Sequence, residues 1–151
     1  MAEARGGESP GEALGITAEL AEGMAGLARR ELEAGRAGGA RAILEGLVVA
    51  NPHDVEAWAL LARAHRALGQ RLAARFCGEV AARVAPGSPE ARLAQAEALL
   101  AFPEERGRAL GLLGQLAGAG GAGADRARTL LSALGAPGGP CDGKGSEVGE
   151  M

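Results

Sequence analysis

The chain has 151 residues and a formal net charge of −3, so its length suits one domain and its charge argues against a nucleic-acid partner. Apolar residues make up 47% of the sequence but aromatic residues only 2%, which favours helices packed on helices over a β-sandwich or barrel. No segment has the pattern of a signal peptide or of a membrane span, so we expect a cytoplasmic protein without membrane insertion.

The first two predicted helices span residues 17–34 and 38–50. Gly35 stands between them, where the chain must reverse, and glycine adopts the left-handed conformation that ends a helix at little cost. Ala40 is small enough to let the second helix approach the first closely. Pro52 ends the second helix, because proline lacks the N–H group that a helix interior needs.

The next predicted pair of helices, residues 54–68 and 71–84, repeats this punctuation 34 positions later. Gly69, Ala74 and Pro86 take the places of the glycine, alanine and proline of the first pair. Glycine and proline carry most of the weight in this comparison, because they determine where helices end. The recurrence indicates a helical hairpin that is repeated along the chain.

Three further helices are predicted at residues 89–102, 104–117 and 125–134. Ser88 is a capping residue, and Pro89 suits the first helical position. Phe102 and Pro103 replace the glycine turn of the first two pairs, so the third pair is imperfect. We expect the last helix to cap the stack, because terminal repeats commonly depart from the pattern.

A helical hairpin with a 34-residue period resembles the tetratricopeptide repeat, whose pattern is W-x2-L-G-x2-Y followed by alanine, a large residue and proline. The second pair carries this pattern at Trp58, Leu61, Ala62, His65, Ala74, Ala81 and Pro86. Gly78 stands where a large apolar residue normally packs, so we predict that Phe76 fills the gap. The resemblance covers about residues 21–117. It implies an all-α, tetratricopeptide-repeat helical solenoid of about three helix-turn-helix repeats with a C-terminal capping helix.

The repeats define the expected domain boundaries. We place the tetratricopeptide-repeat domain at residues 17–134, with repeats at about 21–54, 55–88 and 89–122 and the capping helix at 125–134. The flanking segments, 1–16 and 135–151, are rich in glycine, proline and charge and lack periodic apolar residues. Because such composition cannot bury a core, we expect both segments to be disordered.

Residues 27–69 also resemble the first repeats of the class II type III secretion chaperones. Those chaperones have a similar length and three such repeats. The shared run leads from the glycine turn through Leu44, Leu47 and Asn51 to Asp54 at the start of the next helix. The resemblance implies a cytosolic chaperone that holds a translocator of the secretion system until export. A small repeat chaperone for a needle or export component fits the same residues.

In stacked hairpins the first helix of each pair lines the concave groove, which identifies candidate partner-binding residues by helical spacing. We expect this groove to contain Ala25, Arg29, Leu32, Ala59, Arg63, Arg66, Leu93, Glu97 and Leu100. Arginine can hold a carboxylate through two parallel hydrogen bonds, and alanine and leucine suit an apolar segment. The alternative is that the three arginines form a solvated face without a partner.

Neither a catalytic site nor a cofactor or metal site is predicted. The GxGxxG pattern that starts at Gly118 follows a helix rather than a strand, so we interpret it as a linker and not as a dinucleotide site. His53, His65 and Cys77 lack the spacing of metal ligands. Cys77 is expected to be a small buried apolar residue. We therefore predict that the protein is not an enzyme.

Two functions remain open at this point. The first is a protein-binding adaptor or chaperone that holds a client segment in the groove. The second is a scaffold or assembly factor in a stable multiprotein complex. The sequence does not identify the partner, but it favours a protein partner over nucleic acid.

Glycines inside the predicted helices indicate a marginally stable monomer. At roughly 1 kcal/mol each relative to alanine, seven of them cost about 7 kcal/mol, against a typical domain stability of about 5–15 kcal/mol. These glycines are Gly23, Gly26, Gly46, Gly78, Gly107, Gly111 and Gly114. We expect the chain to gain stability from a partner or from self-association, for example as a homodimer.

Overall fold

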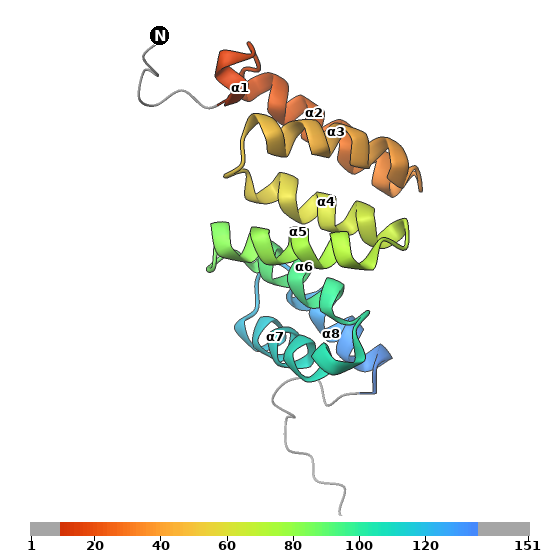
Figure 1. The fold of residues 1–151 in the computed structure, drawn as a ribbon. Helices are drawn as coiled ribbons and strands as arrows, with labels where there is room; N and C mark the ends of the chain where they lie inside the picture. The colour runs from red at the N-terminus through yellow and green to blue at the C-terminus, as the bar shows by residue number, and fades with distance from the viewer. Residues whose placement is uncertain (1–9, 136–151) are drawn as a thin grey trace, which may run out of the picture.

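The computed structural model describes residues 10–135, which form a stack of helices (Figure 1). The elements in chain order are α1 (Pro10–Ala13), α2 (Ala18–Glu33), α3 (Ala37–Ala50), α4 (Val55–Ala67), α5 (Arg71–Val84), α6 (Pro89–Leu99), the 3-10 turn η1 (Pro103–Glu105), α7 (Arg106–Ala119) and α8 (Ala124–Ala133). From α2 to α8 each α-helix packs against the next one in sequence, and α4 also contacts α6. This sequential packing confirms the predicted all-α solenoid of helical hairpins.

The helices begin and end close to the predicted residues. Gly35 and Gly69 follow α2 and α4 with φ angles of 78° and 73°, in the left-handed region where glycine is favoured. Asp54 and Ser88 accept backbone N–H bonds at the starts of α4 and α6, as expected. Thr17 does the same for α2, although the sequence analysis did not single it out. Each cap satisfies a donor that the helix itself leaves without a partner.

The chain is ordered before the predicted start of the domain. Helix α1, Pro10–Ala13, lies inside the segment 1–16 that was expected to be disordered, and for these four residues that expectation is wrong. Gly11 of α1 is buried against α3: a Cβ added to it would lie 3.1 Å from the Cβ of Ala50. Residues 1–9 of the first expected segment and residues 136–151 of the second lie outside the described residues.

The third hairpin turns without a glycine. Helix α6 ends at Leu99, three residues earlier than predicted, and η1 leads into α7 at Arg106. Phe102 is extended, with φ −116° and ψ 111°, because a residue that precedes proline is disfavoured from helical geometry. The Phe102–Pro103 pair therefore ends the helix before the 3-10 turn begins.

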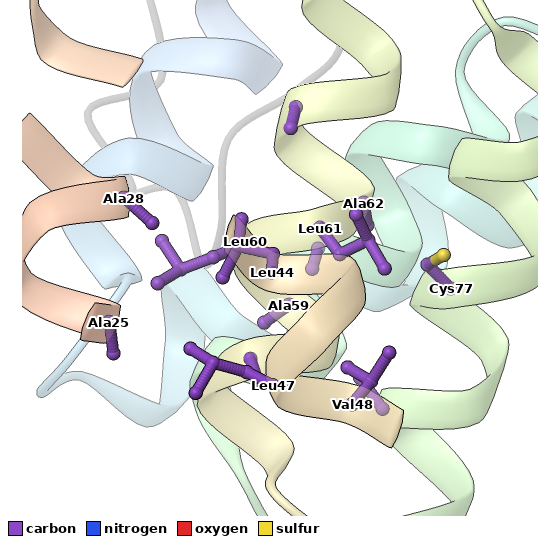
Figure 2. Packing of buried hydrophobic residues seen from close by; sticks show 14 of the residues in the cluster. Ala25, Ala28, Leu44, Leu47, Val48, Ala59, Leu60, Leu61, Ala62 and Cys77 are labelled. Atoms are coloured by element: carbon purple, nitrogen blue, oxygen red, sulfur yellow. The ribbon is translucent and has the colours of Figure 1, made fainter. Parts of the chain in front are cut away.

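Two apolar clusters hold the stack together. The first contains side chains from α2 to α6, and Figure 2 shows many of them gathered around Leu44 of α3 and Leu60 of α4. The second contains Leu113 and Leu116 of α7, Leu131 of α8 and Ala96 of α6. Helix α6 contributes to both clusters. It therefore connects the two halves of the core.

Gly78 leaves no gap in the middle repeat. A Cβ added to it would lie 3.0 Å from the Cα of Gln95 and 3.2 Å from the carbonyl oxygen of Ala94, so the backbones of α5 and α6 meet at this point. The prediction that Phe76 fills a gap here is wrong. Phe76 is 61% exposed and stacks edge-on against Trp58, with 6.2 Å between the ring centroids.

The other glycines of the predicted helices do not mediate close helix packing. A Cβ added to Gly26 would meet only the guanidinium end of Arg30, at 3.9 Å. A Cβ added to any of the remaining five would meet no atom of another residue's packing within 4 Å. These five are Gly23, Gly46, Gly107, Gly111 and Gly114. At these positions the cost of glycine in a helix is not offset by closer packing.

We expect Gly46→Ala in α3 and Gly111→Ala in α7 each to raise the free energy of unfolding by about 1 kcal/mol, because alanine loses less backbone entropy in a helix than glycine does. Urea titration followed by far-UV circular dichroism measures the change. Both substitutions should leave the spectrum of the folded protein unaltered. A loss of stability in either variant would contradict the open surroundings of these two positions.

Candidate partner-binding cleft

A cleft of about 510 Å³ lies along the face formed by α2, α4, α6 and α8. Helices α2, α4 and α6 are the first helices of successive hairpins, and these are the helices that were expected to line a concave groove. The lining residues are Arg29, Glu56, Ala59, Leu60, Arg63, Arg66, Glu90, Leu93, Ala94, Glu97 and Arg126. The cleft thus combines an apolar floor with charged side chains of both signs.

The cleft brings together six of the nine residues predicted for the groove: Arg29, Ala59, Arg63, Arg66, Leu93 and Glu97. The other three lie elsewhere. Ala25 is buried in the first apolar cluster, and Leu32 packs against the same cluster. Leu100 lies just beyond the end of α6 and packs against the second cluster. These three side chains stabilise the stack instead of lining the cleft.

Five lining residues were not predicted from the sequence. Glu56 and Leu60 share a helical stripe with Ala59 and Arg63, at separations of three and four residues, so a complete count of that stripe would have included them. The same reasoning would have found Glu90 and Ala94 on α6. Arg126 comes from α8, which was interpreted only as a cap, and its sequence neighbours give no sign that it faces a cleft.

Glu97 holds three helices together at one end of the cleft. Its side chain is only 7% exposed, and it forms ion pairs with Arg66 of α4 and Arg126 of α8. The Nε of Arg126 donates to Oε1 of Glu97 at 2.9 Å, and an NH group of Arg66 donates to the other carboxylate oxygen. A carboxylate that is shared in this way is compensated despite its burial. We call Glu97, Arg66 and Arg126 the clasp.

A second ion pair crosses the other end of the cleft, between Arg29 of α2 and Glu56 of α4. Both side chains are nearly half exposed, so solvent screens the attraction and the pair contributes little to stability. A ligand can therefore displace it at small cost. The clasp, by contrast, is part of the framework of the cleft.

Arg63 is an unpaired cation in the lining of the cleft. It is exposed, and among residues 10–135 no carboxylate pairs with it. The adjacent floor is apolar, because Ala59, Leu60 and Ala94 are almost completely buried and still border the cleft. Such a surface can accept an apolar segment and a nearby carboxylate at the same time.

Within the part of the chain that the structure describes, no group of three or more His, Cys, Asp or Glu side chains could hold a metal ion. Burial raises the pKa of the Cys77 thiol to about 11, with a smaller contribution from the nearby Glu45 carboxylate. The thiolate that would be needed for nucleophilic chemistry is therefore scarce at neutral pH. Of the described helices, none is both long enough and apolar enough to cross a membrane.

Residues 21–64 match the family model of the tetratricopeptide repeat. The chain carries a tetratricopeptide repeat. The match covers the first hairpin and most of α4, where the glycine, alanine and proline punctuation is most regular. The sequential packing of the later helices continues the tetratricopeptide-repeat fold beyond this segment.

Solved structures of type III secretion proteins share this tetratricopeptide-repeat fold. The translocator chaperone SycD of Yersinia enterocolitica matches with a TM-score of 0.71 and 21% identity, over 85% of this chain and 99% of SycD. A chain of a type III secretion complex from Aeromonas hydrophila matches with a TM-score of 0.71 and 22% identity, over 85% of this chain and 89% of the other. The resemblance to translocator chaperones that the sequence predicted is confirmed at the level of the fold.

A chain of the CopN–Scc3 complex matches with a TM-score of 0.69 and 16% identity, over 88% of this chain and 79% of that one. No curated protein matches the chain by sequence. At these identities the likeness concerns the path of the backbone. The side chains in the cleft must therefore be considered on their own.

Proposed function

We propose that the chain is a cytoplasmic protein-binding chaperone that holds a segment of a client protein in the cleft, and that it serves a type III secretion system. The observation that carries the proposal is the cleft itself, which lies on the first helices of the hairpins in a fold shared with a translocator chaperone over 85% of the chain. The client is a protein, because an apolar floor bordered by charged side chains suits a peptide segment.

The size and chemistry of the cleft support a short segment as its occupant. A volume of about 510 Å³ accommodates a few side chains and not a folded domain. The buried alanines and Leu60 remove apolar side chains of the client from water. Arg63 then adds a charged contact that selects the register of the segment.

A scaffold in a stable complex is the alternative function, and one observation favours it. Leu72 and Phe76 are 75% and 61% exposed and lie four residues apart on α5, outside the cleft. Exposed apolar side chains that share one helix face suit a lasting protein contact. A scaffold would use this face and leave the cleft empty.

Affinity purification from the native cells, with mass spectrometry, distinguishes the two functions. The tagged wild type is compared with Arg63→Glu in the cleft and with Leu72→Glu/Phe76→Glu on α5. The chaperone proposal expects an apolar secreted or membrane-inserting protein that is lost with Arg63→Glu and retained by the α5 variant. A soluble multiprotein assembly that is lost only with the α5 variant would establish the scaffold instead.

We expect Arg63→Glu to weaken binding of the co-purified client by about tenfold or more, equivalent to about 1.4 kcal/mol, because it replaces the unpaired cation by a repelling charge. Arg30→Glu is the matched control, since Arg30 is an exposed arginine on α2 that does not line the cleft. Isothermal titration with the purified client measures both affinities. Equal affinities for the two variants would show that the segment does not bind at Arg63.

A further inference from the structure

A second hollow, of about 450 Å³, lies between α5, α6 and α7. It shares no lining residue with the cleft. Helix α6 separates the two: Leu93 and Glu97 border the cleft, whereas Arg92 and Gln95 border the hollow. The hollow is therefore an independent surface of the protein. We call it the arginine pocket, after Arg83, Arg92 and Arg108, which line it.

The arginine pocket is positively charged in a chain whose net charge is −3. Its three arginines face one acidic lining residue, Glu79. The closest carboxylate contacts of Arg108 are 3.6 Å to Glu79 and 3.8 Å to Glu105, which are longer than hydrogen bonds. Glu79 itself is shared with Arg75, at 3.4 Å.

The other two arginines of the pocket have no carboxylate partner in the described region. The Nε of Arg92 donates to the backbone carbonyl of Pro86 at 2.8 Å, which fixes the side chain but leaves its charge uncompensated. Arg83 makes no hydrogen bond or ion pair with any described residue. This differs from the cleft, where Arg29 and Arg66 pair with glutamates. The pocket thus holds two guanidinium groups without a carboxylate partner among residues 10–135, beside Arg108 with its two long ion pairs.

Gln95 adds an uncommitted polar group to the wall of the pocket. Its residue is only 9% exposed, yet its side chain has no hydrogen-bond partner in residues 10–135. Because this amide borders the pocket, a ligand oxygen can accept a hydrogen bond from it. The close approach of Gly78 to the backbone of Gln95 holds this wall against α5.

We propose that the arginine pocket binds carboxylate side chains of an acidic protein segment. Guanidinium groups bind carboxylates through paired hydrogen bonds, and the amide of Gln95 supplies a further donor. The pocket is larger than a single small anion, and Leu112 and Ala82 give it an apolar side that suits the aliphatic neighbours of an acidic residue. Because it lies apart from the cleft, a second segment can dock there while the cleft is occupied.

Isothermal titration of the full chain tests this binding. The probe is an acetylated and amidated peptide, Glu-Leu-Asp-Glu-Leu-Asp, and the matched peptide Gln-Leu-Asn-Gln-Leu-Asn differs only in charge. We expect the acidic peptide to bind at least about tenfold more tightly than its amide analogue, and we expect added salt to weaken its binding. Equal affinities for the two peptides, or no binding of the acidic one, would overturn the proposal.

Variants locate the peptide on the protein. Arg83→Gln/Arg108→Gln should lower its affinity by about tenfold or more, and Gln95→Leu should lower it by a smaller factor. Arg30→Gln/Arg36→Gln removes the same charge from exposed residues that line neither the pocket nor the cleft, and it should leave the affinity nearly unchanged. Circular dichroism establishes that each variant is folded. If the control variant weakens binding as much as the pocket variant, or if the pocket variant binds as tightly as wild type, the peptide binds through general charge or at another surface, and the proposal fails.

Inorganic phosphate distinguishes a protein ligand from a free anion. Phosphate at millimolar concentration is expected to compete only weakly with the acidic peptide, because it makes no apolar contact with Leu112 or Ala82. Tight binding of phosphate that depends on Arg83 and Arg108, without binding of the peptide, would identify the pocket as a small-anion site. That outcome would overturn the assignment of an acidic protein segment.

Discussion

Replacing Gly78 with leucine is expected to lower the free energy of unfolding by about 3 kcal/mol or more, although a large apolar residue is what the repeat pattern has at this position. The atoms that a Cβ would meet belong to the backbone of α6: the Cα of Gln95 at 3.0 Å and the carbonyl oxygen of Ala94 at 3.2 Å. A side chain can rotate away from a contact, but a backbone cannot. Leucine at position 78 therefore forces α5 and α6 apart.

Gly111→Leu is the matched control, because the same change is made inside α7, where nothing lies within 4 Å of an added Cβ. This control should gain nearly 1 kcal/mol, since leucine is a better helix former than glycine. Chemical denaturation followed by circular dichroism gives both values. If Gly78→Leu were as stable as the control, the close packing of α5 on α6 would be wrong.

Gly78 also illustrates what a repeat pattern can and cannot predict. Gly35, Gly69 and Pro52 were assigned correctly because their effects are local: a helix ends where its own backbone must turn or lacks a donor. The role of Gly78 depends on a helix that begins eleven residues later, at Pro89. The repeat pattern has a large residue at position 78. Only the distance between the backbones of α5 and α6 shows that the two helices pack closely here without such a side chain.

Helix α1 was missed for a related reason. Four residues, Pro10–Ala13, are too few to establish a helical period. The segment is held by a tertiary contact, because Gly11 lies against Ala50 at the end of α3. The composition of this segment suggested disorder, and composition does not report a contact made 39 residues away in the chain.

The cleft could be predicted in part. Helical spacing on α2, α4 and α6 placed residues such as Arg29, Arg63 and Glu97 on one face, and the structure brings them together in the cleft. It failed for Leu32 and Leu100, which lie at helix ends, where the direction of a side chain is set by the turn as much as by the helix. It also failed for Ala25, which lies inside α2 but is buried in the first apolar cluster. The clasp could not be predicted either, because Arg126 reaches Glu97 from a helix of the C-terminal cap.

Removing both arginines of the clasp, Arg66→Ala/Arg126→Ala, is expected to lower the free energy of unfolding by about 3 kcal/mol, the lower end of the range for a buried pair. Glu97 is only 7% exposed and would lose both of its cationic partners. The cost stays at the lower end because the cleft admits water to the freed carboxylate. Urea denaturation of the variant against wild type measures it.

A second variant separates the loss of ion pairs from the loss of side-chain volume. Arg66→Met/Glu97→Leu/Arg126→Met removes every charge of the clasp but keeps apolar contact, and it should recover much of the lost stability, because well-packed apolar residues often replace buried ion pairs without penalty.

Hydrogen exchange shows which helix is destabilised when the clasp is removed. In Arg66→Ala/Arg126→Ala, amides of α8 should lose protection before those of α3, since the clasp joins α8 to α4 and α6. Equal protection of α8 in the variant and the wild type would mean that the apolar contacts of Leu131 hold this helix, and that the clasp serves the cleft alone.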